Sequence, residues 1–119
     1  MPRAKVFHNQ NRNTMFCAVP ADYNPVDYKL VAEVANEVEK FSDAHDFLEY
    51  VYEKTNSTFQ YWGRNKGVND FIGKNRSTSV GDVIEYAGSK YMVSNVGFTK
   101  MTDANCPYIE SEEPKLVSA

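Results

Sequence analysis

The segment 43–55 carries the strongest local signal in the chain and constrains its fold most. Ser42 or Asp43 is a suitable N-cap for a helix there, because either side chain is able to accept a hydrogen bond from a first-turn amide. Asn56 follows the segment and suits the left-handed C′ position. One face of the expected helix gathers the apolar side chains Phe47, Leu48, Val51 and Tyr52. Such a face needs a second layer of structure to cover it.

The N-terminal part of the chain predicts two short strands separated by loops. Residues 5–7 start a strand, and the polar run 8–13 is a turn or loop, because asparagine tolerates left-handed backbone and bonds its own main chain. Residues 14–19 are apolar except for the first and predict a second strand. Residues 20–25 contain two prolines and predict a loop.

Residues 27–39 fit two secondary structures. A spacing of four residues, which suits an amphipathic helix, connects Val26, Leu30, Val34 and Val38. An alternation with mostly polar residues, which suits a strand, involves Val26, Tyr28, Leu30, Ala32 and Val34. Periodicity alone therefore leaves helix and strand open.

The C-terminal part predicts a β-hairpin. Residues 80–86 and 90–96 read as buried strands, and residues 87–89 form a three-residue loop with glycine in the middle. Residues 99–101 predict a last short strand. Together with the helix, these segments predict an α+β domain with a small, mostly antiparallel sheet. The apolar helix face is expected to pack on Val83, Ile84, Tyr91 and Val93.

Length and composition predict one globular domain. The chain has 119 residues, of which 42% are hydrophobic and 24% charged, and this composition is typical of a folded protein. The domain is expected to span 1–109, followed by a flexible acidic tail at 110–119. The net charge of −3 gives the whole molecule no strong attraction to nucleic acid or anionic membrane. No secretion signal or membrane-length apolar run is visible, so a cytoplasmic location is expected.

Residues typical of catalysis or metal binding are sparse. Cys17 and Cys106 lie far apart without a CxxC pair, and His8 and His45 form no metal-binding pattern. No glycine-rich phosphate loop or Ser-His-Asp set is recognisable. His45 shares a helix turn with two acidic residues, but this pattern is more typical of a helix surface. We therefore expect no catalytic residues, no metal and no cofactor.

The most distinctive motif is Asn-Arg-Ser-Thr-Ser-Val-Gly-Asp-Val-Ile at residues 75–84. Gly81 permits a positive φ, and Asp82 is able to accept bonds from nearby amides and fix a turn before the strand. Ser77 and Ser79 are expected to cap neighbouring main-chain groups. Turn chemistry alone explains these residue types, although an anion-facing loop remains an alternative.

A turn does not need a guanidinium, so Arg76 requires a separate explanation. It either pairs with a carboxylate of the acidic block, such as Glu49 or Glu53, or faces an anionic ligand. A buried pair predicts that removal of the side chain destabilises the fold, whereas an exposed contact predicts a loss of binding only.

A set of short motifs is spread over about residues 26–101: Tyr28, Val31, Leu48, Tyr52, Thr55-Asn56, Trp62, Asn65-Lys66-Gly67-Val68, the run from Arg76 to Ile84, Tyr91, Val93 and Gly97-Phe98. In these motifs the chain resembles a family of small proteins and modules of phages, plasmids and conjugative elements that is related to the YodL-like domain. The resemblance implies a strand at 28–35 ahead of the helix, and this chain departs by extra residues around 36–43. It implies mobile-element biology in a bacterial host, but no agreed activity.

Basic and aromatic residues interleave in the segment 59–76. Trp62, Arg64, Lys66 and Arg76 supply the ring and charges that stack on bases and pair with phosphates of single-stranded nucleic acid. An ordinary solvated loop with aromatic anchors explains the same pattern, and a glycine-punctuated loop at 63–76 is long for a small domain. The candidate binding residues are Trp62, Arg64, Lys66, Arg76, Ser77, Ser79 and Asp82.

The sequence favours a non-enzymatic accessory protein of a phage or mobile element that binds a macromolecule of the host or of the element. A protein partner in the bacterial host is expected first, and no membrane is involved. The alternative is a nucleic-acid-binding module that uses 59–76, and an enzyme with an unrecognised site ranks third. The acidic residues around the helix are expected to form a solvated face or a surface that competes for a nucleic-acid-binding host protein.

Overall fold

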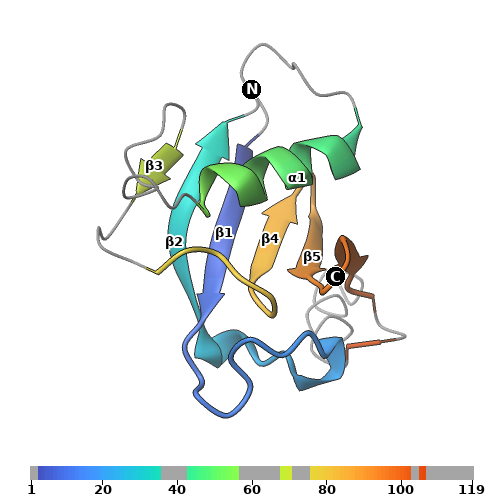
Figure 1. The fold of residues 1–119 in the computed structure, drawn as a ribbon. Coiled ribbons are helices and arrows are strands. Elements are labelled where there is room, and N and C mark those ends of the chain that lie inside the picture. The colour runs from blue at the N-terminus through green and yellow to red at the C-terminus, as the bar shows by residue number, and fades with distance from the viewer. Residues whose placement is uncertain (1–2, 36–42, 57–67, 71–75, 103–104, 107–119) are drawn as a thin grey trace, which may run out of the picture.

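The computed structural model describes residues 3–35, 43–56, 68–70, 76–102 and 105–106. Within these ranges, six strands form one sheet in the order β3-β2-β1-β4-β5-β6, and each neighbouring pair is antiparallel. The elements are β1 (Arg3–Asn9), the 3₁₀ turns η1 (Pro20–Asp22) and η2 (Pro25–Asp27), β2 (Tyr28–Ala35), α1 (Ala44–Lys54), β3 (Val68–Asp70), β4 (Val83–Tyr86), β5 (Ser89–Val93) and β6 (Phe98–Lys100). The helix α1 crosses one face of the sheet (Figure 1). The predicted α+β class is confirmed.

The helix begins and packs as its sequence predicts. Asp43 is the N-cap, and its carboxylate accepts a hydrogen bond from the amide of His45 at 2.9 Å. Phe47, Leu48 and Val51 are fully buried against the sheet, and burial of each such side chain contributes about 1.5–3 kcal/mol. The helix ends without the expected left-handed residue at position 56, because Thr55 closes the last turn with its hydroxyl on the carbonyl of Val51 at 2.9 Å.

The sheet has a core on each face. Ile84 and Val93 lie in the helix-side core, and Tyr91 packs against it from a partly buried position. Val83, however, lies in a second core with Met92, so the prediction that it faces the helix was wrong. Successive residues of a strand point to opposite faces, and Val83 and Ile84 cannot both face α1.

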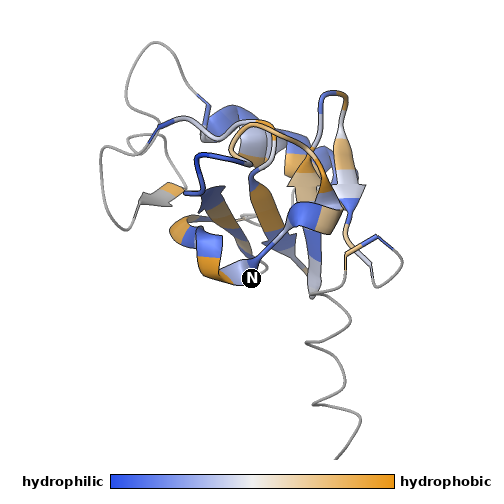
Figure 2. Cartoon of the chain, turned by 90° about the horizontal axis from the view of Figure 1, so that it is seen from below, coloured by the Kyte–Doolittle hydropathy of each residue, from blue (hydrophilic) through white to orange (hydrophobic). Residues whose placement is uncertain are grey.

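The second core is covered by the connection between β1 and β2. Tyr23 from this connection is buried against Val83 and Met92, and Tyr28 packs against the same cluster. In Figure 2 the strands form a middle layer, with α1 on one side and the connection with its short 3₁₀ turns on the other. The chain between residues 10 and 27 therefore acts as a third layer, although it contains no strand.

Two predictions for the N-terminal part were wrong. His8 and Asn9 belong to β1 and are buried, whereas a turn or loop was expected over 8–13. The chain turns two residues later, after Asn9, whose side chain accepts a hydrogen bond from the main-chain amide of Asn11 at 2.8 Å. Residues 14–19 form turns and loop instead of a strand. Phe16 there has a φ of +69°, which breaks any extended conformation.

The ambiguous segment forms the strand β2, as the resemblance implied. Its register against β1 shifts by one residue, since Val6 pairs with Ala32 and Phe7 pairs with Leu30. Val31 is therefore the extra residue of a β-bulge, and both Val31 and Ala32 are buried. The bulge explains why the alternation of β2 is imperfect.

The C-terminal hairpin is confirmed, with shorter strands and a tighter turn than expected. Tyr86 pairs directly with Ser89, so the loop has two residues, Ala87 and Gly88, with φ values of +54° and +83°. Two successive positive φ angles are those of a type I′ turn, whose twist matches the flanking strands. The last strand is β6, which begins at Phe98, one residue earlier than expected.

Part of the expected long loop over 63–76 forms the edge strand β3, which pairs with β2. The aromatic stretch 58–62, the remainder of that loop before Arg76 and the tail 110–119 lie outside the described residues.

Candidate functional site

A buried ion pair fixes the turn before β4. The Arg76 guanidinium donates from Nη1 to Oδ2 of Asp82 at 2.6 Å and from Nη2 to Oδ1 at 2.8 Å. The same carboxylate accepts bonds from the amides of Asn9 at 2.9 Å and Ser79 at 2.8 Å. Asp82 is 1% exposed and Arg76 is 28% exposed. These four bonds offset the cost of burying the carboxylate.

This geometry tests the expectations for residues 76–82. Asp82 accepts amide bonds as predicted, and Gly81 has a φ of +93°. Arg76 pairs with Asp82, so a pair with the acidic block was the wrong prediction. Ser77 and Ser79 contribute a carbonyl and an amide of the main chain, and the Thr78 side chain contributes a hydroxyl.

The histidine of β1 completes the network. His8 Nε2 lies 2.9 Å from the Thr78 hydroxyl and 3.9 Å from Asp82 Oδ2. Burial lowers the pKa of His8 to about 4, with a further lowering by Arg76 and an opposing effect of Asp82. The imidazole is therefore neutral near pH 7. The network is a structural junction that ties β1 to the turn before β4.

Three further bonds link this junction to the end of the helix and to β2. The Thr78 amide donates to the Thr55 carbonyl at 2.9 Å, and Asn56 Nδ2 donates to the Thr78 carbonyl at 2.7 Å. The Tyr28 hydroxyl donates to the Gly81 carbonyl at 2.7 Å, and burial together with the nearby Asp82 raises its pKa above the ordinary value. The turn is thereby fixed to three elements of the fold.

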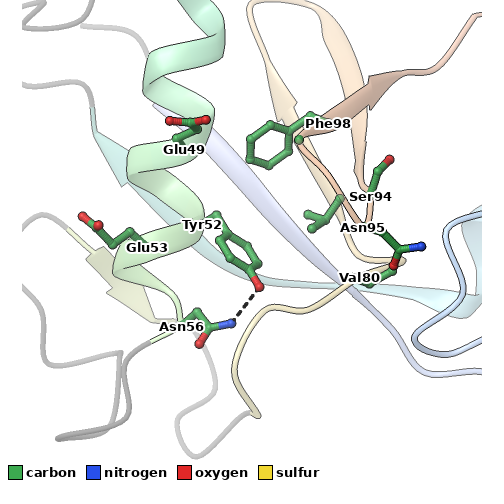
Figure 3. A pocket seen from close by; sticks show the side chains of 10 residues that line it. Glu49, Tyr52, Glu53, Asn56, Val80, Ser94, Asn95 and Phe98 are labelled. Atoms are coloured by element: carbon green, nitrogen blue, oxygen red, sulfur yellow. Dashed lines mark hydrogen bonds between the residues drawn. The ribbon is translucent and has the colours of Figure 1, made fainter.

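A groove lies beside this junction, between the second half of α1 and the segment 94–98. It has a volume of about 460 Å³, and its lining includes Glu49, Tyr52, Glu53, Asn56, Val80 and Phe98. In Figure 3, Tyr52 points from the helix toward the strands and Phe98 points back from the opposite wall. Three parts of the chain that are distant in sequence therefore meet at this surface.

The aromatic wall of the groove is held in place by its neighbours. The rings of Tyr52 and Phe98 meet edge to face with centroids 6.4 Å apart, and His45 approaches Phe98 at 5.7 Å. Asn56 Nδ2 donates to the Tyr52 hydroxyl at 3.1 Å. Because the Asn56 amide also bonds Thr78, the position of Tyr52 depends on the buried junction.

An acidic ridge, defined as Asp46, Glu49 and Glu53, separates this groove from a second hollow. Glu49 and Glu53 line both, and the second hollow has a volume of about 360 Å³. Glu49 Oε2 lies 3.3 Å from His45 Nε2, and both side chains are more than half exposed. The predicted neighbourhood of His45, Asp46 and Glu49 thus exists, but on the helix surface.

The remaining candidates are placed as follows. Trp62, Arg64 and Lys66 lie outside the described residues, so their role in binding stays a prediction. Arg76 faces Phe16, with its guanidinium carbon 5.1 Å from the ring centroid. Cys17 and Cys106 are free thiols. Within the described ranges, no three His, Cys, Asp or Glu side chains gather as metal ligands do, and no helix is long and apolar enough to cross a membrane.

Sequence reasoning missed the groove, because its walls come from separate segments whose approach depends on tertiary packing. A partial signal was present in Tyr52, Asn56 and Gly97-Phe98, which belong to the pattern of the resembled family but come from two distant segments. The chain matches no known family model, no curated protein and no solved structure. Membership of the YodL-related family therefore stays a prediction.

Proposed function

We propose that this chain is a non-enzymatic accessory protein of a phage or mobile element, which acts in the bacterial cytoplasm by binding a macromolecule through the groove beside α1. The groove, with its aromatic wall and polar rim, is the observation that supports a binding role. The mobile-element context depends on the sequence resemblance alone.

The composition of the groove suits recognition of a protein. Tyr52 and Phe98 offer large rings of the kind that dominate binding energy at interfaces. The amide of Asn95 and the side-chain oxygen of Asn56 are polar groups of the lining that suit hydrogen bonds to the main chain of a partner. The buried junction behind Asn56 holds one wall of the groove in place, which lowers the ordering cost of binding.

Nucleic-acid binding by 59–76 is the second candidate function. Its phosphate contacts would lack Arg76, because that guanidinium is committed to the Asp82 carboxylate. The carboxylates at the groove rim also oppose a phosphate backbone there. We therefore rank a protein partner above nucleic acid, and an enzymatic activity third.

Affinity capture from a bacterial lysate, with and without nuclease, tests the proposal. Asn95→Trp places a bulky ring at the groove, and Asn13→Trp makes the same change at an exposed residue of the β1–β2 connection. We expect the wild type and Asn13→Trp to capture a protein whether or not nuclease is added, and Asn95→Trp to lose it. Equal capture by both variants, or recovery of nucleic acid alone, contradicts the proposal.

A further inference from the structure

The charged side chains of the groove give it a preference for positively charged ligands. Its charged lining side chains among the described residues are Glu49 and Glu53, both carboxylates. Asp46 extends the same ridge along the adjoining hollow. Glu49 contacts His45, whereas Glu53 forms no ion pair with any residue that the structure describes. A cation entering the groove would meet two acceptors and a negative local potential.

The aromatic wall adds a second requirement. The edge-to-face rings of Tyr52 and Phe98 lie in the same groove as the carboxylates. A lysine or arginine side chain satisfies both features, because its methylene stem packs on rings while its charged head reaches a carboxylate. Arginine suits this arrangement better than lysine, since its planar fork stacks on aromatic rings and bonds carboxylates in pairs.

The volume and polar groups of the groove favour a peptide segment over a lone ion as the main occupant. About 460 Å³ exceeds the space that a single ammonium group requires. Ser94 and Asn95 line the strand side of the groove, beyond Phe98 in Figure 3. A nucleic acid would bring phosphates against Glu49 and Glu53, which costs free energy.

We infer that the groove beside α1 binds a short, arginine- or lysine-bearing segment of a partner protein, with the cation at Glu49 and Glu53 and its stem against Tyr52 and Phe98. This inference rests on the proposed function, which makes the groove the binding surface. It adds the chemistry of the partner, a basic and extended peptide segment.

Titration of the isotope-labelled full chain with peptide pools tests this chemistry. The pools share randomised flanks without cysteine and differ in two central residues, which are arginine, glutamine or glutamate. With the arginine pool we expect amide shifts at residues 49–56 and 94–98 that weaken as salt is added. With the glutamate pool we expect none there. Equal responses to the arginine and glutamine pools overturn the inference.

Charge-neutral variants separate local recognition from the net charge. Glu49→Gln and Glu53→Gln should each weaken binding of the arginine pool by about 2- to 5-fold, the range of partly exposed ion pairs. Asp22→Asn removes one charge from an exposed residue of η1 and should leave the affinity unchanged. An equal loss with Asp22→Asn means that the attraction is nonspecific and contradicts the inference.

The two proposals fail in different ways. If Asn95→Trp abolishes capture of the lysate protein while Glu49→Gln and Glu53→Gln leave it unchanged, the groove is the binding surface but does not read a basic segment. If Asn95→Trp leaves both capture and peptide binding unchanged, the groove is not the binding surface and the proposed function fails with the inference.

Discussion

The substitution Arg76→Ala gives the sharpest test of the buried junction. It removes both charged donors to Asp82 and a donor to the carbonyl of Asn9, which Nη2 bonds at 3.1 Å. Removal of one partner from a buried ion pair costs about 3–5 kcal/mol. Arg76 is 28% exposed, and Asp82 keeps two amide donors, so we expect the lower end, about 3 kcal/mol.

Urea denaturation followed by far-ultraviolet circular dichroism measures this loss. A fall of about 3 kcal/mol corresponds to a melting temperature lower by about 12 °C in a chain of this size, at about 4 °C per kcal/mol. Arg12→Ala is the matched control, because Arg12 is exposed on the turn after β1 and should change stability by less than about 0.5 kcal/mol. Arg76→Lys keeps the charge without the fork and should fall between the two.

A double-mutant cycle with Asp82→Asn assigns the loss to the pair. We expect a coupling energy above about 1.5 kcal/mol, since the two side chains share two charge-assisted bonds. If Arg76→Ala stays within about 0.5 kcal/mol of the wild type, or matches Arg12→Ala, the junction contributes little and the reasoning is refuted.

Three further perturbations test other parts of the fold. Gly81→Ala should destabilise the protein by about 2 kcal/mol or more, because φ is +93° and the new Cβ would lie 2.8 Å from the Cys17 carbonyl oxygen. Gly88→Ala is the control for the backbone cost alone, because Gly88 has a φ of +83° and open space around the new Cβ. Equal losses of stability in the two variants would contradict the close contact at Gly81. Because His8 has a folded pKa of about 4 against 6.5 when unfolded, stability should be full above pH 6.5 and fall by about 3 kcal/mol as the pH drops toward 4, in urea titrations over that range. His8→Gln should flatten this slope, and an unchanged slope would exclude His8 as its source. Ala87→Asn should raise the unfolding free energy by about 0.5–1 kcal/mol in the same assay, since asparagine tolerates the φ of +54° that alanine disfavours, and a decrease would argue against the type I′ turn.

The fold could be predicted where local signals are strong. The N-cap and one-sided apolar face were sufficient to place α1 within one residue at each end, and the glycine after Ala87 indicated the hairpin. The strand predicted at 14–19 was wrong, because an apolar run indicates burial but does not determine the secondary structure that buries it. In this segment the left-handed φ of Phe16, and just before it the hydrogen bond from the Asn11 amide to the Asn9 side chain, override the strand propensity of the apolar residues.

The candidate site could be predicted only in part. Turn chemistry gave the role of Asp82 as an amide acceptor, but the partner of Arg76 lies six residues away on the same turn, a proximity that no periodicity encodes. His8 was predicted to be a loop residue because it begins the polar run 8–13, and the Thr78 hydroxyl that it contacts is 70 positions distant. Long-range polar contacts of this kind follow from the sheet register, which the sequence does not display.

The central position of β1 has a consequence for the order in which the chain folds during translation. β1 leaves the ribosome before β4, its neighbour on one side, and the bond from Asn9 to Asp82 spans 73 residues. Until β4 emerges, the edge of β1 that will pair with it stays unpaired, although β2 and α1 have already been synthesised. Such an intermediate is a substrate for chaperones and prone to pair with another chain. Completion of the sheet, and with it the groove, therefore waits until β4, β5 and β6 have been synthesised.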